Sequence, residues 1–239
     1  MIKYTTIDIE TTGLNRYKDK ITWIGIGLSE EIGKDIKYSY TYNMSDPQAV
    51  ERFRKMYNKI KQHKLTTVFQ NGKFDTLFIE EQLKLKIPIH EDVMLLATAY
   101  DLAAEHGLKA MAQAYLGVPD WDISKKDKLS GSEEIVEPYL RLDVQYTWEL
   151  FCYFQKHMTE HQFKIYDKIL RPAYQMYRDV ERNGAYVDID SLRSVRAKYH
   201  KLEIERKKKL TDRYDINWNS SAQVAKVLFE DEGLPGIKK

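Results

Sequence analysis

Two carboxylates near the start of the chain are the first residues that could do chemistry. Asp8 and Glu10 lie in the stretch TTIDIETTGL (residues 5–14), which otherwise resembles a buried strand. Residues i and i+2 of a strand face the same side, so these two like charges would repel one another. A divalent cation such as Mg2+ or Mn2+ takes oxygen ligands and would relieve the repulsion. The pair indicates a candidate metal site, with a solvated strand edge as the competing interpretation.

Two later motifs could complete such a site. QNGKFD (residues 70–75) places Asp75 where a strand gives way to a helix, close to the strand ends at which open α/β sheets bind ligands. YLRLD (residues 139–143) places Tyr139 and Asp143 four residues apart on one helix face. Separately, Tyr139 could be a core aromatic and Asp143 a surface charge. The three motifs together, in this order, are much harder to attribute to chance.

The elements that must position these residues follow from hydrophobic periodicity and turn residues. Closely spaced strands predict an antiparallel meander, and later strand–helix alternation predicts a mixed sheet flanked by helices, an α/β fold. A mostly helical segment follows. Strands are expected at 2–9, 21–28, 36–42 and 65–71, helices at 47–62, 74–85, 92–104, 108–116, 135–158, 165–183 and 191–212, and a polar loop at 119–134.

Composition restricts the class of protein. The 239 residues are 43% hydrophobic, enough for a sizeable core, and no apolar run is long enough to span a membrane. The first residues lack the apolar run of a signal peptide. The lone cysteine, Cys152, cannot form an internal disulfide, so we expect a cytoplasmic location.

The net charge of +2 is unevenly distributed. Residues 1–160 carry 21 Lys and Arg against 24 Asp and Glu, whereas residues 161–239 carry 17 against 12. Much of the excess lies in the helix expected at 191–212, whose charges are either a solvated face or a surface that follows nucleic-acid phosphates. The loop lysines Lys125, Lys126 and Lys128 either contact phosphates or lie in a disordered loop.

The motifs D-x-E-T-T-G, N-x-x-x-D and Y-x-x-x-D resemble those of the DEDD 3′–5′ exonucleases, tyrosine subclass. More closely, residues 1 to about 158 resemble the proofreading domain of family A, polymerase I-like DNA polymerases, of the phage type. The segments EDVMLLATAYD and HGLKAMAQAYLG are similar to the helices between the second and third motifs. The resemblance implies a ribonuclease H-like fold and a metal-dependent DNA 3′–5′ exonuclease.

The resemblance also implies roles for individual residues. Asp8, Glu10, Asp75 and Asp143 would bind two divalent ions, Mg2+ or Mn2+, which serve both ends of the phosphodiester displacement. Tyr139 would orient the attacking water. The substrate, single-stranded DNA or a frayed 3′ end, would contact Thr11, Leu14 and Asn71. Asn71 could equally cap the helix that follows it.

The later segment, residues 161–239, resembles the beginning of the polymerase domain of the same family, in the thumb-base region. The segment NWNSSAQVAKVLF matches its N-x-x-S-x-x-Q-x-x-x-x-L-F pattern. We therefore expect an exonuclease domain at 1–160 and a polymerase fragment at 161–239 that lacks palm and fingers and has no polymerase activity. The remaining polymerase could be a separate chain. Apolar residues such as Leu228, Phe229 and Leu234 should then be poorly covered.

Two other functions remain compatible with the motifs. A ribonuclease D-like RNA 3′-exonuclease shares all three of them, although the polymerase-like segment argues against it. A non-catalytic subunit of a split polymerase would need no intact site, yet all four carboxylates and the tyrosine are present.

Overall fold

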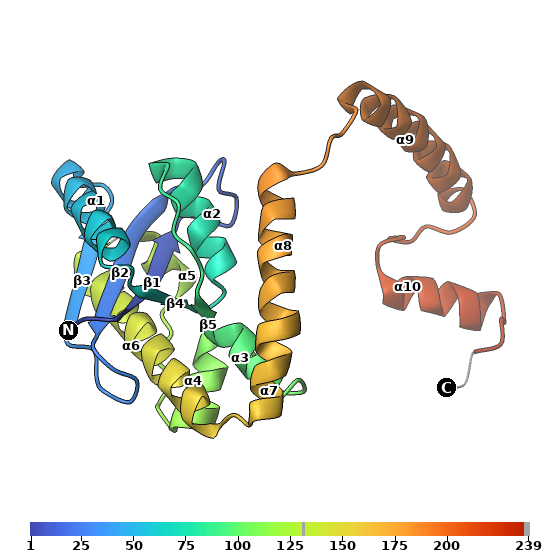
Figure 1. Ribbon diagram of the computed structural model, residues 1–239. Helices are drawn as coiled ribbons and strands as arrows, with labels where there is room; N and C mark the ends of the chain where they lie inside the picture. Colours follow the sequence, from blue (N-terminus) through green and yellow to red (C-terminus); the bar gives the residue numbers. More distant parts are fainter. Residues whose placement is uncertain (131, 237–239) are drawn as a thin grey trace. The chain divides into compact units, whose positions relative to one another are not determined.

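The computed structural model describes residues 1–130 and 132–236, except for the side chains of Lys125 and Ser130, and divides the chain into two compact units. The first unit is Met1–Asn183 and the second is Gly184–Lys239 (Figure 1). The break therefore falls after Asn183, and the boundary that we expected near residue 160 lies inside the first unit. Within the described residues no helix is long and apolar enough to cross a membrane.

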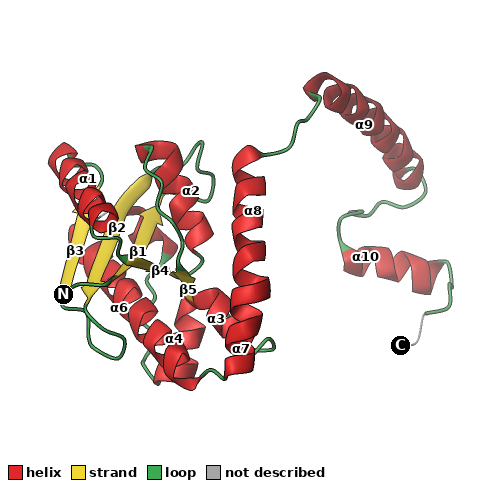
Figure 2. Cartoon of the chain, in the orientation of Figure 1, coloured by secondary structure: helices red, strands yellow, loops and turns green. Residues whose placement is uncertain are grey.

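A mixed sheet forms the centre of the first unit, as predicted, and it has five strands where four were expected (Figure 2). Its first three strands are the expected antiparallel meander, and the fourth runs parallel to the first. A fifth strand, which includes Asp92, a residue that we had assigned to the start of a helix, runs parallel to the fourth. The strands, in the spatial order β3-β2-β1-β4-β5, are β1 (Tyr4–Thr11), β2 (Ile21–Ser29), β3 (Tyr38–Asn43), β4 (Thr66–Phe69) and β5 (Glu91–Asp92).

Helices surround this sheet. Helix α5 (Lys125–Ser130) was not expected, because residues 119–134 were predicted to form a polar loop. The helix expected to reach residue 104 ends at Tyr100, where Asp101 turns to extended backbone. The helices of the first unit are α1 (Pro47–Gln62), α2 (Gly72–Leu83), α3 (Val93–Tyr100), α4 (Leu108–Leu116), α5 (Lys125–Ser130), α6 (Glu133–His157), α7 (Glu160–Ile165), a π-helical turn η1 (Tyr166–Leu170) and α8 (Arg171–Asn183).

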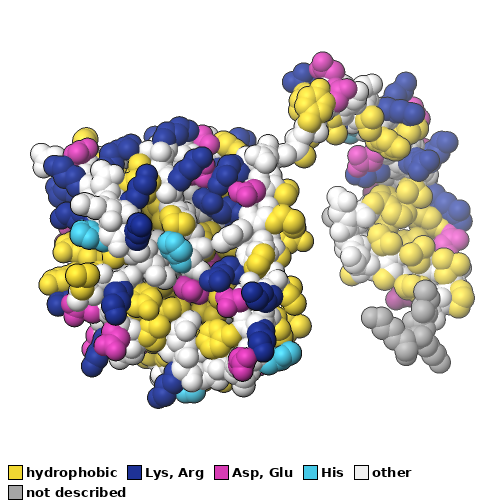
Figure 3. Space-filling model, in the orientation of Figure 1, with side chains coloured by type: hydrophobic (Ala, Val, Ile, Leu, Met, Phe, Trp, Pro, Cys, Tyr) yellow, Lys and Arg dark blue, Asp and Glu magenta, His cyan; other side chains and the backbone are white. Residues whose placement is uncertain are grey.

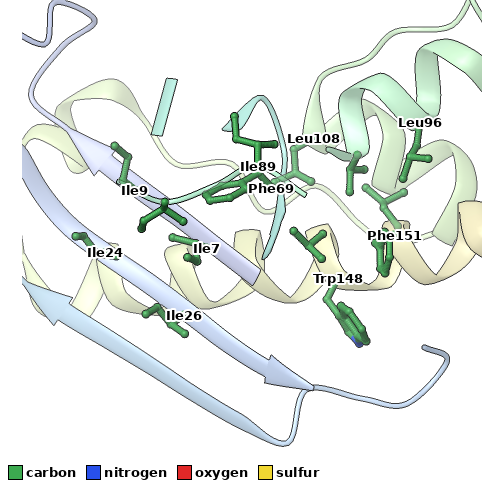
Figure 4. Packing of buried hydrophobic residues seen from close by; sticks show 14 of the residues in the cluster. Ile7, Ile9, Ile24, Ile26, Phe69, Ile89, Leu96, Leu108, Trp148 and Phe151 are labelled. Carbon is green, nitrogen blue, oxygen red and sulfur yellow. The ribbon is translucent and has the colours of Figure 1, made fainter. Parts of the chain in front are cut away.

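The alternation of β1 separates its apolar residues from its acidic ones. Ile7 and Ile9 are buried and lie beside Ile26 and Ile24 of the neighbouring strand β2 (Figure 4). The even-numbered positions, including Asp8, face the opposite side of the sheet. Helix α6 packs along β1 and β2, and its Trp148 and Phe151 are part of the same buried core.

The second unit is helical and buries little. It consists of α9 (Ile189–Thr211), α10 (Ser221–Lys226) and a π-helical turn η2 (Val227–Asp231). Hydrophobic side chains are exposed on the face seen in Figure 3. Leu228, Phe229 and Leu234 are exposed, as expected from the sequence, and so are Leu192, Val195 and Tyr199 of α9.

Candidate active site

Three carboxylates from two elements converge on one point beside the sheet. Asp8 and Glu10 come from β1, and Asp143 comes from α6. One oxygen of each lies within 4.8 Å of the others. A set of three carboxylate oxygens at this spacing suits hard divalent cations. The arrangement predicted from the D-x-E and Y-x-x-x-D motifs is therefore present.

Two glycines of β2 let α6 approach the sheet closely. Gly25 is paired with Asp8 across the β1–β2 ladder. A Cβ atom on Gly25 would lie 2.8 Å from Val144 Cγ2 and 2.9 Å from Leu140 Cγ, and one on Gly27 would lie 2.9 Å from Val144 Cγ1. A side chain at either position would push α6 outward. The missing side chains thus bring Asp143, which is adjacent to Val144, towards Asp8.

The fourth carboxylate, Asp75, lies in the first turn of α2 and is buried. Its Oδ1 accepts a hydrogen bond from the backbone N–H of Ile9, at 3.0 Å. Ile9 lies between Asp8 and Glu10 in the strand, so this bond fixes Asp75 against the acidic segment of β1. Asp75 is not among the three residues whose oxygens meet within 4.8 Å. Its negative charge nevertheless raises the pKa of Asp8.

The electrostatics of the cluster suit cation binding. Burial, followed by the charges of Asp75, Asp143 and Glu10, raises the pKa of Asp8 well above its ordinary value. Burial and the Asp143 charge raise the pKa of Glu10 to about 7. Burial likewise raises the pKa of Asp75. Each charge is unfavourable in the metal-free protein, and divalent cations bound among them would offset that cost. The donor set therefore fits metal ions of the kind expected.

Tyr139 lies one helical turn before Asp143, and both side chains are buried on α6. The Nζ atoms of two lysines contact its phenolic oxygen, Lys109 at 2.6 Å and Lys128 at 2.7 Å. Lys109 Nζ also lies 2.6 Å from Asp143 Oδ1, which in addition accepts the indole N–H of Trp121 at 2.7 Å. Burial raises the pKa of Tyr139, so its phenol stays neutral.

Sequence reasoning missed Lys109 as a site residue. One local signal was available, because Lys109 lies in the first turn of α4, where a positive charge opposes the helix dipole. Lys128 was expected either to contact phosphates or to lie in a disordered loop. It lies instead in α5, where it pairs with Asp122 at 2.9 Å and contacts Tyr139. The side chain of Lys125 lies outside the described part of the chain.

The predicted substrate residues are near one cavity at the end of β1. A cavity of about 270 Å3 has Leu14 and Asn71 in its lining, and Leu14 is 87% exposed. Thr11 Oγ1 donates to the carbonyl of Gly13 at 2.7 Å and so shapes the turn that presents Leu14. The full lining is Leu14, Arg16, Asn71, Lys73, Phe74, Leu77, Phe78 and Glu181.

Asn71 does not cap α2 with its side chain, so the alternative role that we considered for it is wrong. It occupies the N-cap position in the left-handed region, at φ 57°, without a side-chain cap bond. Asp92 instead accepts the backbone N–H groups of Asn71 and Gly72, at 3.2 and 2.8 Å. The side-chain oxygen of Asn71 accepts a hydrogen bond from the hydroxyl of Tyr174 instead.

Helix α8, whose residues belong to none of the three motifs, contacts the Asn71 loop, which we define as residues 70–73, from the end of β4 into the first turn of α2. Tyr174 Oη donates to Asn71 Oδ1 at 3.2 Å and accepts the backbone N–H of Lys73 at 2.9 Å. Lys73 also forms an ion pair with Glu181 of α8. Residues after position 160, which we assigned to the polymerase fragment, therefore contribute to the surroundings of the candidate site.

Comparisons with known proteins agree with this geometry. The family model described as a 3′-5′ exonuclease of the DNA polymerase A type matches residues 2–159. The chain is 28% identical over 242 residues to DNA polymerase I of Borreliella burgdorferi, covering 97% of this chain and 26% of that protein. It is 25% identical over 234 residues to the DNA polymerase of Bacillus phage SP01, covering 84% and 25%. The chain thus spans about a quarter of the length of these curated relatives.

Solved structures show the same fold at low identity. Brucella melitensis NrnC matches with a TM-score of 0.55 and 19% identity over 75% of this chain and 83% of that one. The POL domain of Pol1 from M. smegmatis, in complex with DNA primer-template and dNTP, matches with a TM-score of 0.61 and 13% identity over 98% and 38%. These likenesses support a ribonuclease H-like fold, and the family match shows that the chain belongs to the 3′–5′ exonuclease family of polymerase A-type DNA polymerases.

Proposed function

We propose that the chain removes nucleotides from DNA 3′ ends with two divalent ions, Mg2+ or Mn2+, held by Asp8, Glu10, Asp75 and Asp143. The observation that carries this proposal is the meeting of three carboxylate oxygens within 4.8 Å, beside a fourth, buried carboxylate. Two such ions supply a nucleophile at neutral pH and stabilise the leaving oxygen.

Each residue of the site has a part in this proposal. Asp8 and Glu10 hold ions from the strand, and Asp143 holds them from the helix. Asp75, tied to the backbone of Ile9, supports the second ion position. Tyr139 orients the attacking water by hydrogen bonding, since its pKa is raised and its phenol is a poor base.

The cavity at Leu14 and Asn71 is the proposed place of the 3′-terminal nucleotides. Its lining combines apolar side chains, which can contact bases, with Arg16 and Lys73, which can contact phosphates. Terminal bases must leave a duplex to reach the carboxylates, so single-stranded or frayed 3′ ends are the preferred substrate.

The relatives suggest the wider context. Both are named DNA polymerases, which favours DNA over RNA and editing of a growing strand as the biological task. The polymerase that this site would serve could be a separate chain. A single cysteine fits the reducing cytoplasm, which we propose as its location.

The test is degradation of oligonucleotides labelled at the 5′ end. We expect a ladder that shortens from the 3′ end with Mg2+ or Mn2+, no ladder with chelator, and none with Asp8→Ala. Matched DNA and RNA strands, each single-stranded or in a duplex with a mismatched 3′ end, identify the substrate. Faster RNA degradation would favour the ribonuclease D-like activity. Strands that stay at full length with wild-type protein, in Mg2+ and in Mn2+, would favour a non-catalytic subunit.

A further inference from the structure

Lys109 connects the two α6 residues of the candidate site. Its Nζ lies 2.6 Å from Tyr139 Oη and 2.6 Å from Asp143 Oδ1, one helical turn apart. The ammonium lies over the rings of Tyr139 and Trp121, with centroids at 4.3 and 5.0 Å. The side chain is 24% exposed, so these contacts are largely shielded from solvent. A charged, partly buried donor shared by two site residues constrains both of them.

The lysines decide which way Tyr139 can hydrogen bond. A phenolic oxygen has two lone pairs and one proton. Lys109 and Lys128 donate to it at 2.6 and 2.7 Å, and ammonium groups are donors only. With both lone pairs engaged, the phenol can offer only its O–H. The Asp143 carboxylate lies within hydrogen-bonding reach of that O–H and helps to raise its pKa. Tyr139 is therefore held as a hydrogen-bond donor, and it cannot accept a proton from water.

The same ammonium restricts Asp143. Asp143 Oδ1 receives two N–H groups, from Lys109 and from Trp121, which hold the carboxylate in one orientation. These bonds reduce the capacity of that oxygen to bind a metal. In addition, a positive charge beside a metal ligand repels an incoming cation. Lys109 therefore lowers the affinity of the carboxylate cluster for metal while it fixes the geometry of the cluster.

We propose that Lys109 is a positioning residue of the nuclease reaction, which holds Tyr139 as a hydrogen-bond donor and orients Asp143 at the expense of metal affinity. Lys128 supports the first of these two roles. The inference rests on the proposed nuclease function and adds to it two residues outside the D-x-E-T-T-G, N-x-x-x-D and Y-x-x-x-D motifs.

The experiment compares Lys109→Met with wild type in the full chain, because methionine keeps the length of the side chain and removes its charge. One measurement is kcat on single-stranded DNA, and the other is Mn2+ binding without substrate, by calorimetry or electron paramagnetic resonance. We expect kcat to fall by about 10- to 100-fold, as for other small misplacements of catalytic groups. We expect Mn2+ to bind more tightly, by roughly 3- to 10-fold, after removal of a nearby positive charge. Lys156→Met, at an exposed position of α6, is the matched control.

The opposite signs of the two changes distinguish positioning from damage. A site that has merely lost its structure would lose both turnover and Mn2+ affinity, and that result would overturn the proposal. Unchanged kcat in Lys109→Met would overturn it as well. If wild type itself lacks activity but binds Mn2+, the nuclease function fails, whereas the Mn2+ measurement still reports the effect of Lys109 on the cluster.

A second pair of variants tests the donor role alone. Lys128→Met should lower kcat by about 3- to 10-fold in the wild-type background and cause no further loss in the Tyr139→Phe background, because both changes act through one hydroxyl. Equal losses in both backgrounds would show that Lys128 acts elsewhere and would remove it from the proposal.

Discussion

Helices α6 and α9 have nearly the same length, 25 and 23 residues, but different surroundings. Ten side chains of α6 are buried, and α9, whose residues are all described, buries none. Tyr139 and Asp143 lie on the buried helix. When no cation is bound, packing elsewhere on the same element must offset the repulsion between a carboxylate and its neighbouring carboxylates. The contrast teaches that the precision of the site comes from the apolar contacts of α6.

The largest expected effect concerns the chemistry that this packing supports. Asp8→Ala should lower exonuclease turnover by a factor on the order of 10^3 or more, since it removes a shared metal ligand. The metal-free protein should keep its melting temperature or gain stability, because one of several mutually repelling carboxylates is gone. Thermal unfolding with and without Mn2+, together with the 3′-end assay, measures both. A drop of many degrees in the metal-free protein would contradict the electrostatic account.

The next effect compares the two helices directly. Leu140→Ala should lower the free energy of unfolding by about 2–5 kcal/mol, because Leu140 is fully buried against the sheet. Leu192→Ala in α9 should change it by less than about 0.5 kcal/mol, because Leu192 is 55% exposed. Urea unfolding followed by circular dichroism separates the two. Similar losses would mean that α9 is packed as firmly as α6, and the comparison would fail.

The third effect tests the hold of α8 on the Asn71 loop. Tyr174→Phe removes a buried hydroxyl that bonds Asn71 and the backbone of Lys73, and should cost about 1–2 kcal/mol. Its matched control is Tyr177→Phe, an exposed tyrosine on the same helix. We also expect a higher KM for single-stranded DNA in Tyr174→Phe alone. An unchanged KM would mean that α8 stabilises the loop without positioning substrate.

The pH dependence of stability due to Glu10 should be about 1 kcal/mol, because Glu10 is partly exposed and solvent reduces the effect. The pKa of Glu10 rises from its ordinary 4.5 to about 7, so the folded protein holds this proton more tightly than the unfolded chain. Metal-free stability should therefore fall as pH rises from about 4.5 through 7. Mg2+ should offset the fall, because it binds the ionised carboxylates. Melting curves from pH 5 to 8 would refute this if the metal-free protein became more stable.

The smallest effect is expected on the charged face of α9. Lys207 already pairs with Glu203 at 2.7 Å, and the helix buries no residue. We expect replacement of Lys207, Lys208 and Lys209 by alanine to leave the salt dependence of DNA binding unchanged. A slope reduced by about 2–3 would instead show that these lysines contact phosphates, and would make α9 part of the binding surface.

Much of the first unit could be predicted from local patterns. The β1–β3 meander and the helices α1, α4 and α6 could be predicted from hydrophobic periodicity and from the glycine and proline residues at the ends of elements. The two-residue strand β5 could not be predicted, because its pairing with β4 is non-local and Asp92 also begins a helix. Helix α5 was missed because its residues are polar and its support comes from contacts of Lys128 with distant side chains.

The sequence by itself determined which residue types meet at the site. Alternation placed Asp8 and Glu10 on one face of a strand, and helical spacing placed Tyr139 and Asp143 on one face of a helix. Tertiary structure alone decided how these faces meet. Gly25 and Gly27 admit α6 to the sheet, Lys109 joins Tyr139 to Asp143, and Tyr174 holds Asn71. These partners lie about 30 to 120 residues apart along the chain. No local pattern encodes their contact, because packing of the whole unit sets the distance between them.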